Sequence, residues 1–250
     1  MSERASVRLL VVRNDPTDPP ALLGDWWREV GVELDELNAD EGHDVPTRLP
    51  EGYDGLVVLG GAMAAWEDHV APWLPAEREL VRSTVDAGVP VLGVCLGGQV
   101  MTLACGGHVE RATVAEVGLA ELRLTPDAVE DPILGTIADG SPVGQYHVDW
   151  MAELPAGAVL LASSADCAHQ AYRLGERAWA LQFHPEIDSD IMTSWIDDDR
   201  ESVAALGFDA DTIVADFRTR EHELASTWRR FAHAFADVVR AAATHGRGAG

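Results

Sequence analysis

Lysine is missing from this 250-residue sequence, in which all 18 of the Lys and Arg residues are arginines. Without lysine the chain can form neither a Walker-type phosphate-binding loop nor a Schiff base on a side-chain amine. The charge balance is also one-sided, since 42 acidic residues give a formal net charge of −24. Because a polyanionic surface repels phosphate backbones and anionic lipid, we expect neither nucleic acid nor a membrane surface as a partner.

Cysteine is scarce, with three residues at unrelated spacings: Cys95, Cys105 and Cys167. None belongs to a closely spaced cysteine pair of the zinc-binding kind, and a reducing compartment is the simplest setting for such a chain. Long apolar runs are absent too, and Arg4 and Arg8 interrupt the N-terminus, where a signal peptide would need an apolar segment. We therefore expect a cytoplasmic protein.

Short apolar runs alternate with helical patterns through the first hundred residues, which predicts a parallel sheet covered by helices. Three later runs, at 121–124, 159–163 and 178–183, suit mixed or antiparallel strands. The fold class is therefore α/β, with a single doubly wound, mainly parallel sheet that has helices on both faces. The expected strands of the first part are 7–12, 32–37, 53–59 and 89–94, and the expected helices are 20–30, 74–87 and 96–105.

The C-terminal part has a different pattern, because apolar residues such as Trp195, Trp228 and Phe231 recur there at helical spacing. We expect one α/β domain over residues 1–190. A helical C-terminal extension over residues 191–250 would contain one or two helices and pack on the same domain. Its last residues, 245–250, are expected to be disordered.

Residues 91–99 read Val-Leu-Gly-Val-Cys-Leu-Gly-Gly-Gln, a strand that delivers Cys95 into a glycine-flanked turn at the start of a helix. Such an elbow exposes a nucleophile, and the helix N-terminus stabilises the negative charge that develops beside it. The alternative is that Cys95 is a small buried apolar residue at a strand end, which is the usual place of a free cysteine.

A second expected strand ends in His184-Pro185-Glu186. Proline keeps this segment out of a regular helix, so the Glu186 carboxylate can reach the His184 ring. A cysteine, a histidine and an orienting acid are the parts of an acyl-transfer triad. His147 and Asp149 could join His184 and Glu186 as metal ligands. No cysteine pair or further ligand helix accompanies them, and we expect no metal.

Residues 93–99 together with 182–186 resemble the nucleophile elbow and the Gln-Phe-His-Pro-Glu signature of class I glutamine amidotransferases, especially stand-alone members similar to the amidotransferase domain of GMP synthase. Residues 59–63 are similar to the family's Gly-Gly loop, and the resemblance covers most of the chain. It implies that Cys95 is the nucleophile, His184 its base and Glu186 the group that orients the histidine. No cofactor is implied.

The same resemblance implies a set of binding groups around this triad. Backbone amides of Gly61 and Leu96 would hold the oxyanion. Gly60 and Gln99 match positions near the substrate, and His147 and Asp149 fall near the mouth of the site, where a substrate or acceptor contact is expected. Two aromatic residues near the Gly-Gly loop are candidates for the rim of the entrance: Trp66 and Trp73.

Three functions stay open. The first is a glutaminase that hydrolyses the side-chain amide of glutamine through a cysteinyl thioester and releases ammonia for a separate synthase subunit. The second is a stand-alone hydrolase of γ-glutamyl conjugates, which a widened pocket at Ala62 and Gly98 would suit. The third is a binding or regulatory protein without turnover, against which an intact Cys95, His184 and Glu186 argue.

Overall fold

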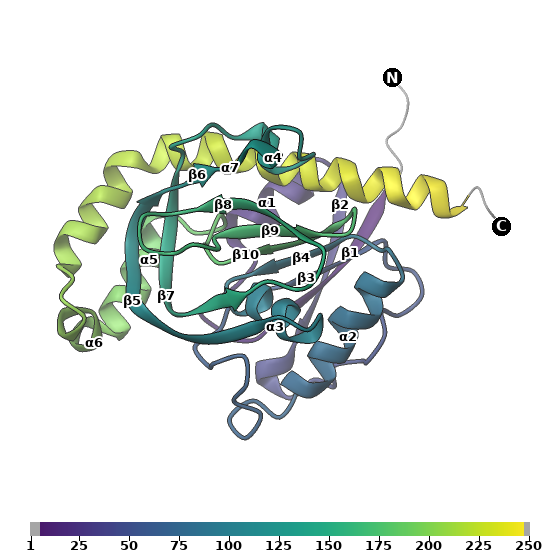
Figure 1. Ribbon diagram of the computed structural model, residues 1–250, viewed down its shortest axis with the longest axis horizontal. Helices are drawn as coiled ribbons and strands as arrows, with labels where there is room; N and C mark the ends of the chain where they lie inside the picture. The colour runs from purple at the N-terminus through teal and green to yellow at the C-terminus, as the bar shows by residue number, and fades with distance from the viewer. Residues whose placement is uncertain (1–5, 248–250) are drawn as a thin grey trace.

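The computed structural model describes residues 6–247 and contains an eight-stranded central sheet in the order β2-β1-β3-β4-β10-β9-β8-β6 (Figure 1). The strands from β2 to β10 in this order run parallel, and those from β9 to β6 continue the sheet antiparallel. The expected doubly wound, mainly parallel sheet is confirmed. The strands are β1 (Val7–Arg13), β2 (Val32–Asn38), β3 (Gly55–Val58), β4 (Val91–Val94), β6 (Arg123–Leu124), β8 (Ala158–Ser163), β9 (Ala171–Leu174) and β10 (Ala178–Leu181).

Alternate residues of the strands feed two separate apolar cores, because successive side chains of a strand point to opposite faces. Leu9 and Val11 of β1 belong to the core beneath α1 and α7, whereas Leu10 and Val12 belong to the core beneath α2 and α3. Helices thus cover both faces of the sheet. The helices are α1 (Ala21–Glu29), α2 (Leu74–Asp86), α3 (Leu96–Ala104), α4 (Pro126–Val129), α5 (Ser189–Asp198), α6 (Arg200–Ala205) and α7 (Ala210–Arg247), with 3-10 turns η1 (Ala39–Glu41) and η2 (Leu134–Thr136).

The C-terminal helices pack on the same core as the sheet. Helix α7 is 38 residues long and crosses the molecule beside α1 (Figure 1). The indole of Trp27 on α1 donates a hydrogen bond to the Ala232 carbonyl of α7, at 2.9 Å. The expectation of one or two helices is wrong, since α5, α6 and α7 follow one another. Residues 245–247 are helical rather than disordered, and 248–250 lie outside the described residues.

A long two-stranded antiparallel ribbon, which the sequence did not predict, lies beside the main sheet. It consists of β5 (His108–Glu121) and β7 (Pro142–Glu153), and its register shifts between Arg111 and Glu116. The ribbon meets the main sheet where the His184 N–H donates to the Gly144 carbonyl, at 2.9 Å. It therefore forms one wall at the end of β10.

None of the helices within residues 6–247 is both long and apolar enough to cross a membrane.

Candidate active site

Cys95 occupies a strained turn between β4 and α3. Its φ and ψ are 50° and −107°, a conformation that costs free energy in a residue with a Cβ. The Cys95 N–H donates to the Leu181 carbonyl of β10, at 2.8 Å. A Cβ on Gly97 would collide with the Val58 carbonyl, so glycine there lets α3 start directly against β3.

Gly98 does not open the pocket. A Cβ at this position would lie 2.5 Å from the Leu181 carbonyl oxygen, so residue 98 faces β10. The expectation that Gly98 widens the space beside Cys95 is therefore wrong, whereas Ala62 does line the cavity.

His184 follows β10 and lies against the cysteine. Its Nδ1 is 2.6 Å from Glu186 Oε1, which leaves Nε2 as the ring nitrogen available to Cys95. Burial lowers the pKa of His184, but the neighbouring Glu186 and Cys95 outweigh burial and hold it well above its ordinary value. The ring also packs edge-on against Trp195, with centroids 4.9 Å apart. The structure thus brings Cys95, His184 and Glu186 into one buried group.

Leu96 and Gly61 carry the backbone N–H groups that are the candidates for an oxyanion hole. Leu96 is the first residue of α3, where the helix leaves N–H groups unpaired, and Gly61 follows the end of β3. Both residues line the cavity, and a Cβ on Gly61 would lie 2.9 Å from Leu96 Cδ2. Within the described part of the chain, neither N–H donates to another protein group. Both N–H groups are therefore available to a ligand in the cavity.

Gln99, His147 and Asp149 come together on the opposite wall and all line the cavity. The carbonyl of Asp149 accepts from Gln99 Nε2 at 3.2 Å, and His147 Nδ1 donates to the same carbonyl at 3.0 Å. Burial raises the pKa of the Asp149 carboxyl, and Arg111 at 3.2 Å partly offsets that rise. Gly60, which the resemblance places near the substrate, is not among the residues that line the cavity.

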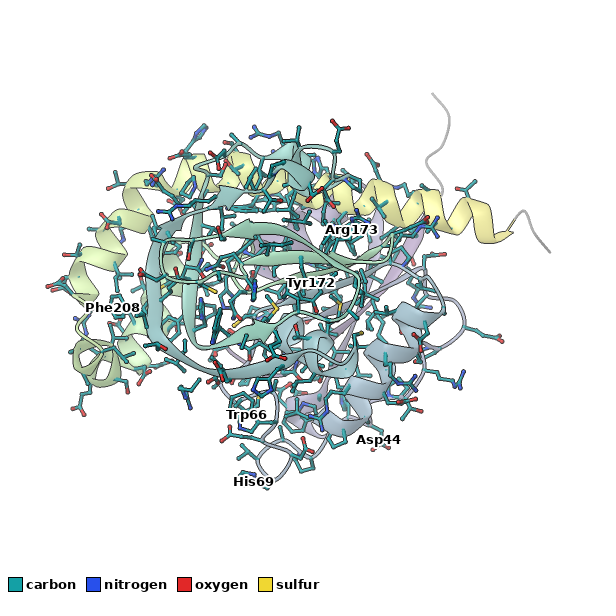
Figure 2. The ribbon with its side chains drawn as sticks, in the orientation of Figure 1. Asp44, Trp66, His69, Tyr172, Arg173 and Phe208 are labelled. Carbon is teal, nitrogen blue, oxygen red and sulfur yellow. The ribbon has the colours of Figure 1, made fainter. Side chains whose placement is uncertain are left out.

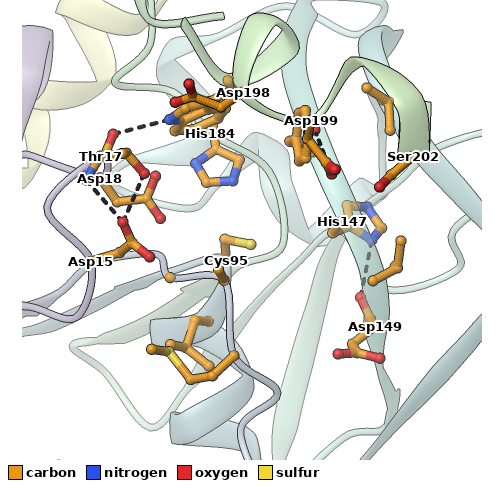
Figure 3. Close-up of a pocket in the computed structure, with 18 of the residues that line it drawn as sticks. Asp15, Thr17, Asp18, Cys95, His147, Asp149, His184, Asp198, Asp199 and Ser202 are labelled. Carbon is orange, nitrogen blue, oxygen red and sulfur yellow. Dashed lines mark hydrogen bonds between the residues drawn. The ribbon is translucent and has the colours of Figure 1, made fainter. Parts of the chain in front are cut away.

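The cavity has a volume of about 810 Å³ and opens over Cys95 (Figure 3). Neither tryptophan expected at its rim lines it. Trp66 lies on the β3–α2 connection (Figure 2), is 43% exposed, and is not among the lining residues. Trp73 donates instead to Asn14 Oδ1, at 2.7 Å. The expected entrance pair is therefore wrong, and α5 and α6 supply that edge with Trp195, Asp198, Asp199, Ser202 and Ala205.

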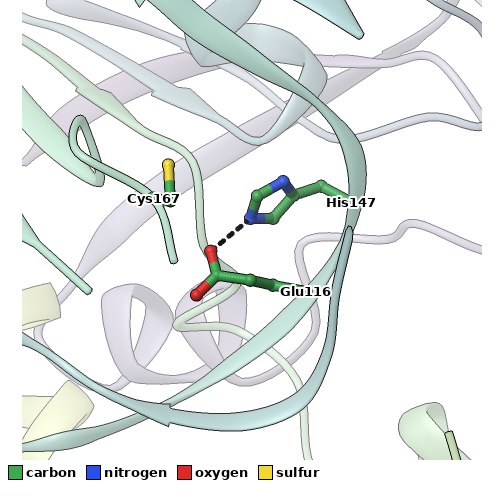
Figure 4. A group of neighbouring side chains, drawn as sticks. All are labelled: Glu116, His147 and Cys167. Atoms are coloured by element: carbon green, nitrogen blue, oxygen red, sulfur yellow. Dashed lines mark hydrogen bonds and ion pairs between the residues drawn. The ribbon is translucent and has the colours of Figure 1, made fainter. Parts of the chain in front are cut away.

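One group with metal-ligating atoms occurs among the described residues, and it differs from the one weighed in the sequence. It consists of Glu116, His147 and Cys167, whose ligand atoms lie within 4.8 Å of one another (Figure 4). The Glu116 carboxylate is already hydrogen-bonded to His147 Nε2 at 3.0 Å, and accepts from Ser164 and Gln170 at 2.6 Å each. This network accounts for the cluster as a support for His147 under the cavity, and we propose no metal there.

Asp18 is a cavity residue that the sequence analysis did not single out. It lies in the turn after β1, and 9% of its surface is exposed. The one available signal was its position beyond the carboxyl end of a parallel strand, where ligands bind in open α/β sheets. Many residues share that position, so the sequence alone could not distinguish Asp18.

Similarity to known proteins indicates the family of this chain. The family model described as glutamine amidotransferase class-I matches residues 24–199. A structure of a glutamine amidotransferase from Thermotoga maritima superposes with a TM-score of 0.82 and 26% identity, covering 92% of this chain and 98% of that one. A glutamine amidotransferase from Methylobacillus flagellatus gives the same TM-score and identity, covering 93% of this chain and 95% of that one.

Curated relatives are longer proteins. A glutamine-hydrolysing GMP synthase from Christiangramia forsetii is 35% identical over 143 residues, which cover 56% of this chain and 26% of that protein. The corresponding enzyme from Cronobacter sakazakii is 34% identical over 171 residues, covering 64% of this chain and 30% of that protein. The matched part of the chain therefore spans less than a third of either relative.

Proposed function

Because the chain belongs to the class-I glutamine amidotransferase family, we propose that it hydrolyses a γ-glutamyl amide through a thioester on Cys95. The observation that carries the proposal is the strained Cys95 turn beside His184, whose ring is held by Glu186 at 2.6 Å. A nucleophile, a base in contact with it and an acid that orients the base are what acyl transfer needs.

In the first half of the reaction, Cys95 Sγ attacks the amide carbon and its proton passes to His184. The Glu186 carboxylate stabilises the imidazolium that results. The N–H groups of Gly61 and Leu96 would then bind the oxyanion, each contributing about 3 kcal/mol to barrier lowering by analogy with other oxyanion holes. The C–N bond breaks as His184 returns the proton to the departing nitrogen, leaving a γ-glutamyl thioester.

In the second half, water attacks the thioester, and His184 takes a proton from it. The C–S bond breaks, glutamate leaves, and the proton returns to Cys95. The substrate's amino-acid end would lie against the wall of Gln99, His147 and Asp149, which is lined with polar groups.

Two substrates fit this chemistry. Glutamine would release ammonia for a separate synthase subunit, as the printed name of the GMP synthase relatives suggests for those proteins. A substituted γ-glutamyl amide would release an amine instead. The cavity volume of about 810 Å³ favours the second, since it lies near the top of the range of about 300–1,000 Å³ for small-molecule sites and exceeds what glutamine fills.

The proposal is tested by incubating the purified protein with glutamine and with γ-glutamyl alkylamides while glutamate release is measured. We expect hydrolysis of at least one of these amides, and none by the Cys95→Ala variant. A folded wild-type protein that cleaves no γ-glutamyl amide, with or without added synthase, would leave the non-catalytic alternative standing.

A further inference from the structure

Asp18 is a buried carboxylate in the cavity wall for which the proposed hydrolysis has no use. Its turn is fixed, because the Asp18 N–H donates to the Asp15 carbonyl at 3.1 Å and Trp195 Nε1 donates to the Thr17 carbonyl at 3.0 Å. Trp195 is also the ring that packs against His184. The Asp18 carboxylate is therefore held at a set position relative to the imidazole.

Within residues 6–247 no group donates a hydrogen bond to this carboxylate and no arginine pairs with it. Its cationic neighbour there is the His184 ring, which lowers its pKa. Carboxylates that are nine-tenths buried are normally paired or hydrogen-bonded, because burying an unpaired charge costs several kcal/mol. An ammonium group of a ligand in the cavity would supply the hydrogen-bond donor that the described residues do not.

The Asp18 carboxylate and the His184 ring both pack against Gly60. A Cβ on Gly60 would lie 2.7 Å from Asp18 Oδ2 and 3.2 Å from His184 Cε1, so glycine lets the two side chains approach each other there. Figure 3 shows Asp18 beside His184, with Asp149 on the opposite side of Cys95. Asp18 thus lies on the histidine side of the nucleophile.

The histidine side is where the departing nitrogen must lie, because His184 has to protonate it as the C–N bond breaks. The glutamyl part would point the other way, toward the wall that contains Gln99 and Asp149. A group attached to the amide nitrogen would therefore extend from His184 along the cavity wall toward Asp18.

Carboxylates outnumber basic side chains around the cavity. Five aspartates line it, against His147 and His184, and no arginine lines it among the described residues. Such a lining attracts a cation and repels an anion. The lining aspartates besides Asp18 are Asp15, Asp149, Asp198 and Asp199.

We propose that Asp18 binds a positive charge on the departing amine, so that the preferred substrate is the γ-glutamyl amide of an aliphatic diamine. The inference rests on the proposed amide hydrolysis and adds the class of substrate. The amide C–N bond breaks, the amine nitrogen takes the proton from His184, and water then cleaves the thioester to glutamate. The second ammonium stays paired with Asp18 until the diamine leaves.

Burial raises the pKa of Asp18 to about 7, with His184 lowering it and Glu186 and Asp15 raising it. Asp18 is therefore increasingly ionised as the pH rises through about 7, and the preference for a cationic amine should rise with it. The two side chains of His184 and Cys95 act on every substrate alike, so the pH dependence of the shared chemistry cancels in the ratio of two kcat/KM values.

The test compares kcat/KM for four amides: glutamine, γ-glutamyl-butylamide, γ-glutamyl-diaminobutane and γ-glutamyl-aminobutyrate, whose leaving groups are ammonia, a neutral amine, a cation and an anion. We expect the wild type to prefer the diaminobutane amide over the butylamide by about tenfold or more. Asp18→Asn should lower kcat/KM for the diaminobutane amide about 10- to 100-fold and that for the butylamide less than about twofold. The wild-type ratio should rise between pH 6 and pH 8.

A matched control is Asp198→Asn, which removes the same charge from an exposed position on the cavity edge. It should leave the ratio of the two substrates within about twofold, since exposed charges contribute little. An equal effect of both variants would mean that the preference comes from the general negative field, and would overturn the role of Asp18.

Two further outcomes would overturn the inference while the proposed function stands. If Asp18→Asn lowers kcat/KM equally for all four amides, then Asp18 binds the α-ammonium that they share, or positions His184. If the wild type has its highest kcat/KM with the butylamide or with glutamine, it does not prefer a cationic leaving group. Failure of the wild type on every amide would instead refute the proposed hydrolysis itself.

Discussion

At the residue scale, His184 and Glu186 have different duties and should differ in what their loss costs. His184→Ala removes the base, and we expect kcat to fall by about 10⁴-fold or more. Glu186→Gln keeps a side chain beside Nδ1 but removes the charge that stabilises the imidazolium, and should retain measurable thioester formation. Single-turnover kinetics would separate the two, and near-native rates in both variants would contradict the mechanism.

Site residues that belong to a short sequence motif could be predicted from the sequence. Residues that come together only in the folded chain could not. Cys95, His184 and Glu186 belong to two compact motifs with recognisable chemistry. Thr17, the neighbour of Asp18, and Trp195 are 178 positions apart and meet because the turn after β1 packs on α5. Their roles depend on that contact, which no local pattern contains.

At the element scale, the loop that carries Gly60 and Gly61 is tied to α2 through Asn14. The Asn14 amide donates to the Leu59 carbonyl at 3.3 Å and to Glu77 Oε1 at 3.2 Å. Glu77 is fully buried, and its other oxygen, Oε2, has no hydrogen-bond partner among the described residues. Burial raises the pKa of Glu77 to about 8, against which Asn14 and Arg78 act. A protonated Glu77 is therefore part of the support for the loop.

The buried Glu77 carboxyl predicts that the free energy of unfolding depends on pH. Between the ordinary pKa of 4.5 and the folded value of about 8, the folded chain holds a proton at Glu77 that the unfolded chain has lost. Stability therefore falls as the pH rises through this range, by about 1.4 kcal/mol per pH unit. Glu77→Gln removes this pH dependence. In urea unfolding, the free energy of unfolding of the variant should therefore rise relative to that of the wild type from pH 5 to pH 8. If the free energies of unfolding of the two proteins change in parallel with pH, Glu77 does not hold a proton in the folded protein over this range.

Helices and strands with a regular apolar pattern were the ones that could be predicted from the sequence. The early strands and helices were found within a few residues, because apolar runs alternate there with helical spacing and end at glycines. The β5–β7 ribbon was missed. Much of β5 is exposed, and its register shifts between Arg111 and Glu116, so it lacks the clean alternation of a strand with one buried face.

At the scale of the whole molecule, α7 links distant parts of the chain to the active site. Trp228 is 1% exposed, donates to the Pro142 carbonyl of β7 at 3.0 Å, and packs on Phe183, with ring centroids 5.1 Å apart. Phe183 directly precedes His184. The C-terminal helix thus stabilises both the ribbon and the segment that presents the histidine.

Trp228→Ala should therefore lower the free energy of unfolding by about 3–5 kcal/mol, the usual cost of truncating a buried aromatic residue. Trp66→Ala is the matched control, because Trp66 is 43% exposed and should change stability by about 0.5 kcal/mol or less. Chemical denaturation of both variants checks this. A Trp228→Ala variant as stable as the control would mean that α7 is not part of the core.

The central claim is that Cys95 is the nucleophile for a γ-glutamyl amide, and covalent labelling tests it most directly. Burial raises the pKa of Cys105 to about 11 and that of Cys167 to about 12, so neither thiol should react at neutral pH. A chloroketone analogue of glutamine, followed by peptide mapping, should therefore modify Cys95 alone, and His184→Ala should slow the labelling. An adduct on Cys105 or Cys167, with Cys95 unmodified in the folded protein, would contradict the account.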